Sequence, residues 1–156
     1  MWYADPQSRI LDWFKFRQSL DIMSEYEAVC ATNKLYHTAP ISNRYYHFDF
    51  PEEWPDPWEL IVENHYDDIA RALGMLYTLR YSRHELPGEL RCYVDKTGSK
   101  EYNLAWLCEG KYVLNYDLGV VVNTNIELKE LNLKARVTLE ELVGNESNSS
   151  NKKEWS

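Results

Sequence analysis

Residues 67–116, DDIARALGMLYTLRYSRHELPGELRCYVDKTGSKEYNLAWLCEGKYVLNY, decide the fold class, because the period of the apolar residues changes once within them. They first recur at helical spacing, which predicts the longest helix, from Asp67 to about Ser82. Gly74 inside this helix predicts close backbone packing. After a Pro-Gly pair the apolar and polar residues alternate, which predicts an antiparallel meander of strands. The predicted strands are 89–94, 102–108 and 111–116.

The segments on either side complete the prediction. Capping residues and helical spacing predict three further helices upstream, over about 5–20, 24–32 and 56–63. Residues 35–56 follow neither period and predict a long loop held in place by packed aromatic rings. Downstream, 120–122 predicts a short strand, and 126–143 predicts a strand-like piece followed by a turn of helix. Helices that precede an antiparallel sheet define an α+β fold.

Length and composition favour one globular domain. The chain has 156 residues, of which 44% are hydrophobic, and we expect a single domain over 1–143. The polar stretch 144–156 is expected to be a disordered tail. No apolar run approaches the roughly 20 residues that span a bilayer, and no secretory signal is visible. Three cysteines, an odd number, indicate reduced thiols in a cytosolic protein.

Charge and motifs exclude several classes of function. The net charge of −8 disfavours general binding to nucleic-acid backbones. The sequence contains no phosphate-binding glycine loop and no nucleophile elbow, so we expect no nucleotide and no other cofactor. A cluster of His65, Asp67 and Asp68 could bind a metal or transfer protons, but helix capping is the favoured interpretation, and we expect no metal site.

The block from Trp54 to Asp117 resembles the transglutaminase-like, papain-related fold, which the Ala105-Trp106 pair and the helix-then-strands spacing carry. The resemblance implies a nucleophilic cysteine at the start of the core helix, then a histidine and an orienting acid or amide on successive strands. These positions fall on Tyr66 or Asp67, on Leu104 and on Asn115. Leucine cannot accept a thiol proton, so the resemblance implies a degenerate, catalytically inactive site.

The whole chain is also similar to a family of small uncharacterised proteins of large contractile-tailed bacteriophages. The similarity is carried by four stretches, which are 12–17 (DWFKFR), 54–61 (WPDPWELI), 64–68 (NHYDD) and 112–116 (YVLNY). It implies a location in the host cytoplasm or in the virion, and it implies no activity.

Aromatic and acidic residues between the second and third predicted helices form a candidate protein interface, since Tyr and Trp are enriched at interfaces. The candidate interface residues are Tyr45, Tyr46, Trp54, Trp58, Glu52 and Glu53. The same region is rich in carboxylates, which could mimic DNA phosphates and occupy the basic cleft of a host enzyme. These carboxylates are Asp49, Glu52, Glu53, Asp56, Glu59 and Glu63.

The sequence therefore predicts a non-enzymatic protein that acts by binding another protein, either as a virion component or as a modulator of a host factor. The partner is expected to be a phage structural protein or a host protein, with no direct contact to nucleic acid or membrane. Two alternatives stay open. One is a cysteine hydrolase or transferase whose nucleophile is Cys92 or Cys108, paired with His84. The other is the acidic DNA mimic.

Overall fold

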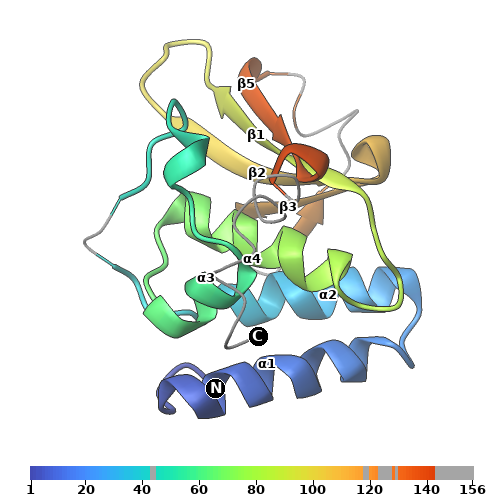
Figure 1. Cartoon of the computed structure of the whole chain (residues 1–156). Coiled ribbons are helices and arrows are strands. Elements are labelled where there is room, and N and C mark those ends of the chain that lie inside the picture. The colour runs from blue at the N-terminus through green and yellow to red at the C-terminus, as the bar shows by residue number, and fades with distance from the viewer. Residues whose placement is uncertain (43–44, 118–119, 123–127, 129, 143–156) are drawn as a thin grey trace.

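An antiparallel sheet covered on one face by helices makes up the computed structural model (Figure 1). The structure describes residues 1–42, 45–117, 120–122, 128 and 130–142. In these residues the helices are α1 (Pro6–Leu20), α2 (Glu25–Tyr36), α3 (Pro57–Glu63) and α4 (Asp68–Arg80), with short 3-10 turns η1 (Pro51–Glu53) and η2 (Cys108–Gly110). Residues 139–142 form a further helical turn after the last strand. The strands are β1 (Gly88–Val94), β2 (Glu101–Leu107), β3 (Tyr112–Asp117), β4 (Val120–Val122) and β5 (Asn132–Thr138).

Each α-helix begins at a residue whose side chain accepts a backbone hydrogen bond from the first turn, as the sequence predicts. These N-cap residues are Asp5, Ser24, Asp56 and Asp67. At Ser24 and Asp56 the capping box is complete, because the glutamate three residues later also accepts from the amide of the cap residue. The polar residues before each apolar run therefore fix where the helices start.

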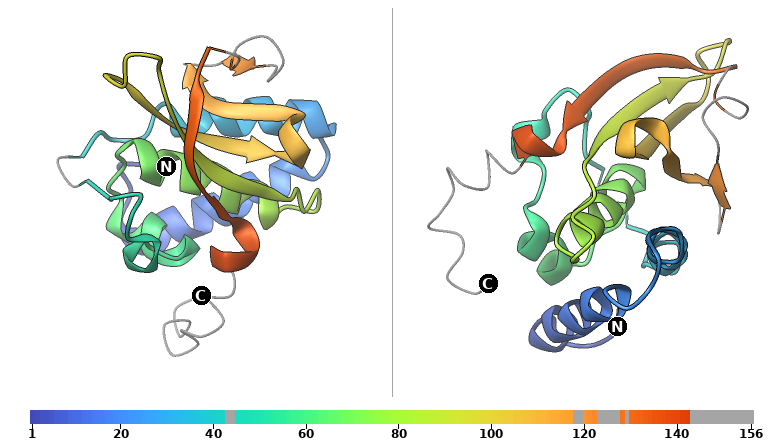
Figure 2. Two further views of the ribbon diagram at one scale, coloured as in Figure 1. Left: turned by 90° about the horizontal axis from the view of Figure 1, so that it is seen from above. Right: turned by 90° about the vertical axis from the view of Figure 1, so that its right-hand side faces the viewer.

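The sheet order is β4-β3-β2-β1-β5, and the paired strands are antiparallel. α4 packs against β1, β2 and β3, while α1 and α3 pack on the side of α4 away from the sheet (Figure 2). The predicted meander is confirmed for β1 to β4, and β5 returns to pair with β1 at the opposite edge. The predicted α+β class is confirmed.

The core lies between α4 and the sheet, with a smaller apolar cluster on the other sheet face. In α4 every residue from Ile69 to Leu79 except Arg71 is buried. A Cβ added at Gly74 would overlap the ring of Tyr36, so the predicted close packing at this glycine is confirmed. The cluster on the outer face contains Tyr93, Leu104, Val113 and Leu128. Both sheet faces therefore bury apolar side chains.

The ends of two elements, α2 and β2, differ from the prediction for reasons that the structure shows. α2 continues to Tyr36, because this ring is fully buried against Trp2 and Tyr66. β2 ends at Leu107, and Cys108 and Glu109 adopt left-handed backbone angles in a three-residue turn. The predicted tail 144–156 lies outside the described residues. None of the described helices combines the length and the apolar character needed to cross a bilayer.

Candidate functional site

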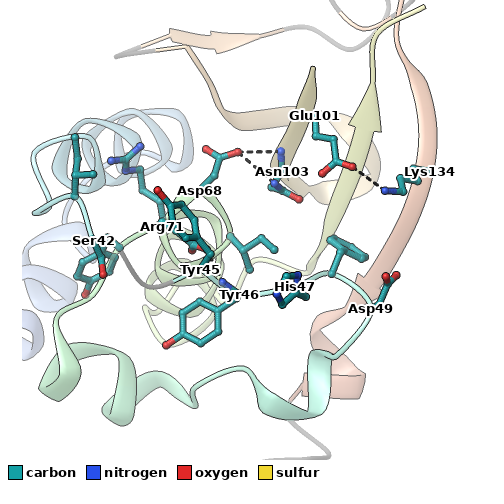
Figure 3. Close-up of a pocket in the computed structure, with 15 residues that line it drawn as sticks. Ser42, Tyr45, Tyr46, His47, Asp49, Asp68, Arg71, Glu101, Asn103 and Lys134 are labelled. Atoms are coloured by element: carbon teal, nitrogen blue, oxygen red, sulfur yellow. Dashed lines mark hydrogen bonds and ion pairs between the residues drawn. The ribbon is translucent and has the colours of Figure 1, made fainter. Parts of the chain in front are cut away.

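A cleft with a volume of ≈ 500 Å³ opens at the N-terminal end of α4 (Figure 3). Its walls come from α4, from β2 and β5, and from the segment between α2 and η1. The volume lies in the range of roughly 300–1,000 Å³ that is typical of ligand sites. Its polar lining includes Tyr66, Asp67, Asp68, Arg71, Asn103 and Lys134.

Asp67 joins the cleft wall to the helix. One carboxylate oxygen accepts from the Ala70 amide at 2.8 Å, which caps α4, and the other accepts from the Tyr46 amide at 2.7 Å. Burial raises the pKa of Asp67 above its ordinary value, although the hydrogen bonds from Ala70 and Tyr46 oppose this shift. Both oxygens serve the backbone, so the predicted capping role of Asp67 is confirmed.

The next residue, Asp68, meets two asparagines from neighbouring strands. Its Oδ2 atom accepts from the backbone N–H and from the side-chain Nδ2 of Asn103, both at 3.3 Å. Its Oδ1 atom accepts from Nδ2 of Asn115 at 3.2 Å. The start of α4, β2 and β3 thus converge on one carboxylate and two amides, and we call Asp68, Asn103 and Asn115 the polar triad.

Asn115 reaches this position through an unusual backbone conformation. Its φ angle is 68°, in the left-handed region that asparagine adopts more readily than most residues. Its backbone N–H donates to Oδ1 of Asn33, and its Nδ2 also donates to the carbonyl oxygens of Asp68 and Asn103, at 3.0 and 2.9 Å. The side-chain amide therefore fixes the spacing between the helix start and the strand.

The polar triad lacks the groups that acyl transfer needs. A cysteine protease or transglutaminase uses a thiolate as nucleophile and an imidazole to accept its proton. The polar triad provides a carboxylate and two neutral amides, and an amide neither accepts nor releases a proton near neutral pH. It can hold a ligand by hydrogen bonds and charge, but it cannot supply a Cys-His pair.

Of the four predicted degenerate-site positions, the structure brings Tyr66, Asp67 and Asn115 to this region and places Leu104 elsewhere. Leu104 points to the outer sheet face, in the second apolar cluster, and its neighbour Asn103 faces α4 instead. Tyr66 is fully buried between Trp2 and Tyr36, at the back of the cleft. Sequence reasoning missed Asn103, and it named Asp68 only in the cluster with His65 and Asp67.

A signal for Asn103 does exist in the sequence. Alternation along β2 places Asn103, Ala105 and Leu107 on one face and Leu104 and Trp106 on the other. Because both sheet faces are apolar, the pattern alone does not say which set faces the helix. The hydrogen bond between Asn103 and Asp68 decides it.

The cysteines considered as relocated nucleophiles lie in environments that oppose activation. Cys92 stands opposite Asn103 in the register of β1 and β2 and is fully buried, and burial raises its pKa to about 11. Burial also raises the pKa of Cys108. The Nε2 atom of His84, the proposed base, forms a hydrogen bond with the carbonyl oxygen of Leu20 at 2.8 Å. A low pKa and an adjacent base are the usual marks of a reactive thiol.

The side chains of His65, Asp67 and Asp68 are not arranged as the ligands of one metal ion. Both oxygens of Asp67 accept backbone hydrogen bonds, and the Nδ1 atom of His65 lies 3.3 Å from Oγ of Ser42. In the described part of the chain, no group of three or more His, Cys, Asp or Glu side chains is arranged to hold a metal ion.

The candidate interface residues divide into an exposed and a buried set. Tyr45 is 70% exposed, and Glu52 and Glu53 are exposed. Trp54 is buried against Phe48, and its indole N–H donates to the carbonyl oxygen of His47.

Two other residues of the candidate interface are half-buried. Trp58 packs edge-on against Trp13 and Tyr81, and Tyr46 donates its amide to Asp67. The two tryptophans therefore hold the loop and α3 to the core, and Tyr45 is the aromatic residue of this set that faces outward.

The acidic stretch that suggested DNA mimicry is partly used within the fold. Asp56 and Glu59 form the capping box of α3, and the Tyr46 hydroxyl lies 3.3 Å from Glu63. Asp49, Glu52 and Glu53 are exposed. With Glu63, which is also exposed, four of the six carboxylates that suggested a phosphate-like array face solvent.

Comparison with solved structures identifies the fold. The calcium-bound structure of LapG from Legionella pneumophila superimposes with a TM-score of 0.63 at 13% identity, covering 86% of this chain and 76% of that chain. A second structure of Legionella pneumophila LapG gives a TM-score of 0.63 at 13% identity and covers 93% and 86% of the two chains. No family model and no curated protein matches the sequence.

At this identity the likeness concerns the fold alone. The transglutaminase-like fold predicted from the sequence is confirmed. The similarity to bacteriophage proteins is not tested by these comparisons and stays a prediction.

Proposed function

We propose that this chain, which has a transglutaminase-like fold, binds a segment of another protein in the cleft beside α4 and breaks no bond there. The observation that carries the proposal is the polar triad. Where the fold brings a helix start and two strands together, this chain holds Asp68, Asn103 and Asn115 in mutual hydrogen bonds. Such a site recognises a ligand by position and charge.

The rim of the cleft supports a protein partner. Ile41 and Tyr45 line the cleft, yet they are 86% and 70% exposed. An aliphatic and an aromatic side chain beside a polar cleft offer apolar contact area around a hydrogen-bonding centre, an arrangement common in protein interfaces. An extended segment could lie across this rim and place one side chain in the cleft.

The similarity to bacteriophage proteins supplies a setting for the partner. In that setting the partner is a phage structural protein or a host protein, and the protein works in the host cytoplasm or in the virion. A virion component would copurify with particles, whereas a modulator of a host factor would be recovered with that factor from infected cells.

Selection from a random peptide library displayed on yeast tests the proposal. The wild-type chain is expected to enrich peptides that Tyr45→Ala and Ile41→Ser bind about tenfold more weakly, because both changes remove apolar area at the cleft rim. Tyr3→Ala and Ile22→Ser are matched controls, since these side chains are also exposed and do not line the cleft. Equal binding by the rim and control variants would contradict cleft binding.

A thiol-directed electrophile tests the competing cysteine-enzyme interpretation. Cys92 is buried and its pKa is raised to about 11, so we expect slow labelling of the native chain and fast labelling in urea. Rapid native labelling of a single cysteine at neutral pH would favour a relocated nucleophile and remove the proposal of a non-enzymatic role.

A further inference from the structure

We propose that the cleft recognises the primary ammonium group of a lysine side chain on the bound segment. The inference rests on the proposed function and names the ligand chemistry of the same site. The inference follows from one buried acceptor, from the charge of the cleft wall and from the carboxylates at the N-terminus of α4.

The acceptor is Oδ1 of Asn103, which lines the cleft. The residue is 9% exposed, and this oxygen has no hydrogen-bond partner in the described part of the chain. The amide orientation is fixed, because Nδ2 donates to Asp68 and a carboxylate can only accept. Oδ1 is therefore a held, oriented acceptor with no donor in the described part of the chain, and an unmade buried hydrogen bond costs stability.

A second buried polar group lies in the same wall. The hydroxyl of Tyr66, a fully buried residue, has no hydrogen-bond partner among the described residues. Burial raises the pKa of Tyr66 well above its ordinary value, so the hydroxyl stays neutral and can accept as well as donate. Buried polar groups without a partner are uncommon, and Asn103 and Tyr66 each carry one in the described part of the chain.

The charge of the cleft favours a cation. Four carboxylates and two cationic side chains line it, a net charge of −2. The charged lining residues are Asp49, Asp67, Asp68, Glu101, Arg71 and Lys134. Lys134 is paired with Glu101 at 2.7 Å, whereas Asp49 and Asp68 form no ion pair with the described residues (Figure 3).

An anionic ligand is disfavoured by the way α4 begins. A helix N-terminus attracts anions through its free N–H groups. Here Asp67 already caps one of those groups, the Ala70 N–H, and Asp68 follows it, so an incoming anion would meet two carboxylates. Arg71, whose Nε atom has no partner among the described residues, is the residue of α4 in this wall that favours an anion.

Ammonium fits better than guanidinium. Arginine binds best through a planar fork to two free carboxylate oxygens. Within the polar triad, both oxygens of Asp68 already accept from amides, and Oδ1 of Asn103 adds one oriented acceptor beside them. An ammonium is compact, and its three donors can be shared between one amide oxygen and nearby carboxylates.

A titration of the isotope-labelled full chain with three short peptides tests the inference. The probes are acetyl-Ala-Lys-Ala-amide and two analogues in which norleucine or Nε-acetyl-lysine replaces the lysine. We expect the lysine peptide to shift the side-chain amide signals of Asn103 and to bind about tenfold more tightly than either analogue. Equal binding of all three peptides would overturn the inference. A fourth peptide, with arginine in place of the lysine, would also overturn it by binding as tightly as the lysine peptide.

Variants locate the effect. Asn103→Leu and Asp49→Asn are expected to weaken binding of the lysine peptide, while Glu140→Gln, which removes an exposed carboxylate outside the cleft, leaves it unchanged. Asp49 is exposed, so its variant reports on binding even if Asn103→Leu fails to fold. Unchanged binding by Asp49→Asn and a folded Asn103→Leu would overturn the assignment.

The peptide library separates this inference from the proposed function. Cleft-dependent peptides that carry a lysine at one position support both. Cleft-dependent peptides without lysine overturn the ligand chemistry and leave the binding function intact. A selection that yields no cleft-dependent peptide contradicts the binding function itself.

Discussion

The two ends of α4 meet the sheet in different ways. Toward its C-terminus, Leu76 and Leu79 are fully buried, and Leu76 lies so close to Gly88 of β1 that a Cβ on this glycine would clash with it. At its N-terminus, Asp67 and Asp68 make hydrogen bonds to a loop and to two strands. One end of the helix therefore secures the fold by apolar packing, and the other carries the polar residues of the proposed recognition site.

The largest expected effect is at the apolar end. Leu76→Ala leaves a cavity against β1, and we expect the free energy of unfolding to fall by about 2–5 kcal/mol. Urea unfolding followed by circular dichroism measures the change. Leu11→Ala, on the half-exposed side of α1, should change it by less than about 1 kcal/mol. Equal losses at the two leucines would show that the α4–sheet contact is not the main source of stability.

Gly74→Ala is expected to have the next largest effect on the unfolding free energy. Alanine favours a helix over glycine by about 1 kcal/mol, but its Cβ would overlap the Tyr36 ring. The overlap dominates, so we expect a net loss of about 1–3 kcal/mol in unfolding free energy. Tyr36→Leu shortens the opposing side chain, and the double variant should lose less than the sum of the two single changes. A stabilised Gly74→Ala protein would mean that the helices move apart at low cost.

The apolar end was largely predictable from the sequence. The helical spacing from Ile69 to Tyr77 gives the buried face of α4, and the alternation of Leu90 and Cys92 gives the inner face of β1. Gly74 indicates where another segment must come close. These patterns are local in the sequence. Any fold that covers the helix would bury the same apolar residues, so the patterns predict burial without knowledge of the fold.

The polar end was not predictable in the same way. Its geometry depends on which face of β2 meets the helix, and Leu104 and Ala105 are both buried, on opposite faces. It also depends on the left-handed backbone at Asn115, which no short motif specifies. The resemblance to the transglutaminase-like fold located the region, and the hydrogen bonds of Asp68 selected the residues.

Asp67 caps the polar end of α4, and its substitution is expected to have an intermediate effect on stability. Asp67→Ala removes the cap of α4 and the hydrogen bond to Tyr46, so we expect a loss of about 1–2 kcal/mol at neutral pH. Urea unfolding measures it. The matched comparison is Asp5, the exposed N-cap of α1. Asp5→Ala should lower the unfolding free energy by less, because its cap bond to Ser8 lies within the same helix.

The raised pKa of Asp67 gives its effect a pH dependence. The folded chain binds this proton more readily than the unfolded chain, so the Asp67 contribution to stability falls as pH rises through the folded pKa. Acidification from neutral pH toward about pH 4 should therefore stabilise the wild type relative to Asp67→Asn. The opposite slope in the difference between the two proteins would show that the hydrogen bonds outweigh burial.

The smallest expected effect on stability is at the polar triad. Asn103→Leu replaces a buried amide by an apolar group of similar size and removes an oxygen that has no partner, while the backbone N–H of residue 103 keeps its bond to Asp68. Gain and loss nearly cancel, so the unfolding free energy should change by less than about 1 kcal/mol. The same variant should lose most of its affinity for the lysine peptide. A loss of stability as large as that of Leu76→Ala would make Asn103 a structural residue, and the two ends of α4 would then no longer differ in role. A stable variant with no affinity would establish that the polar end is retained for recognition, because nothing in the folding free energy would require it.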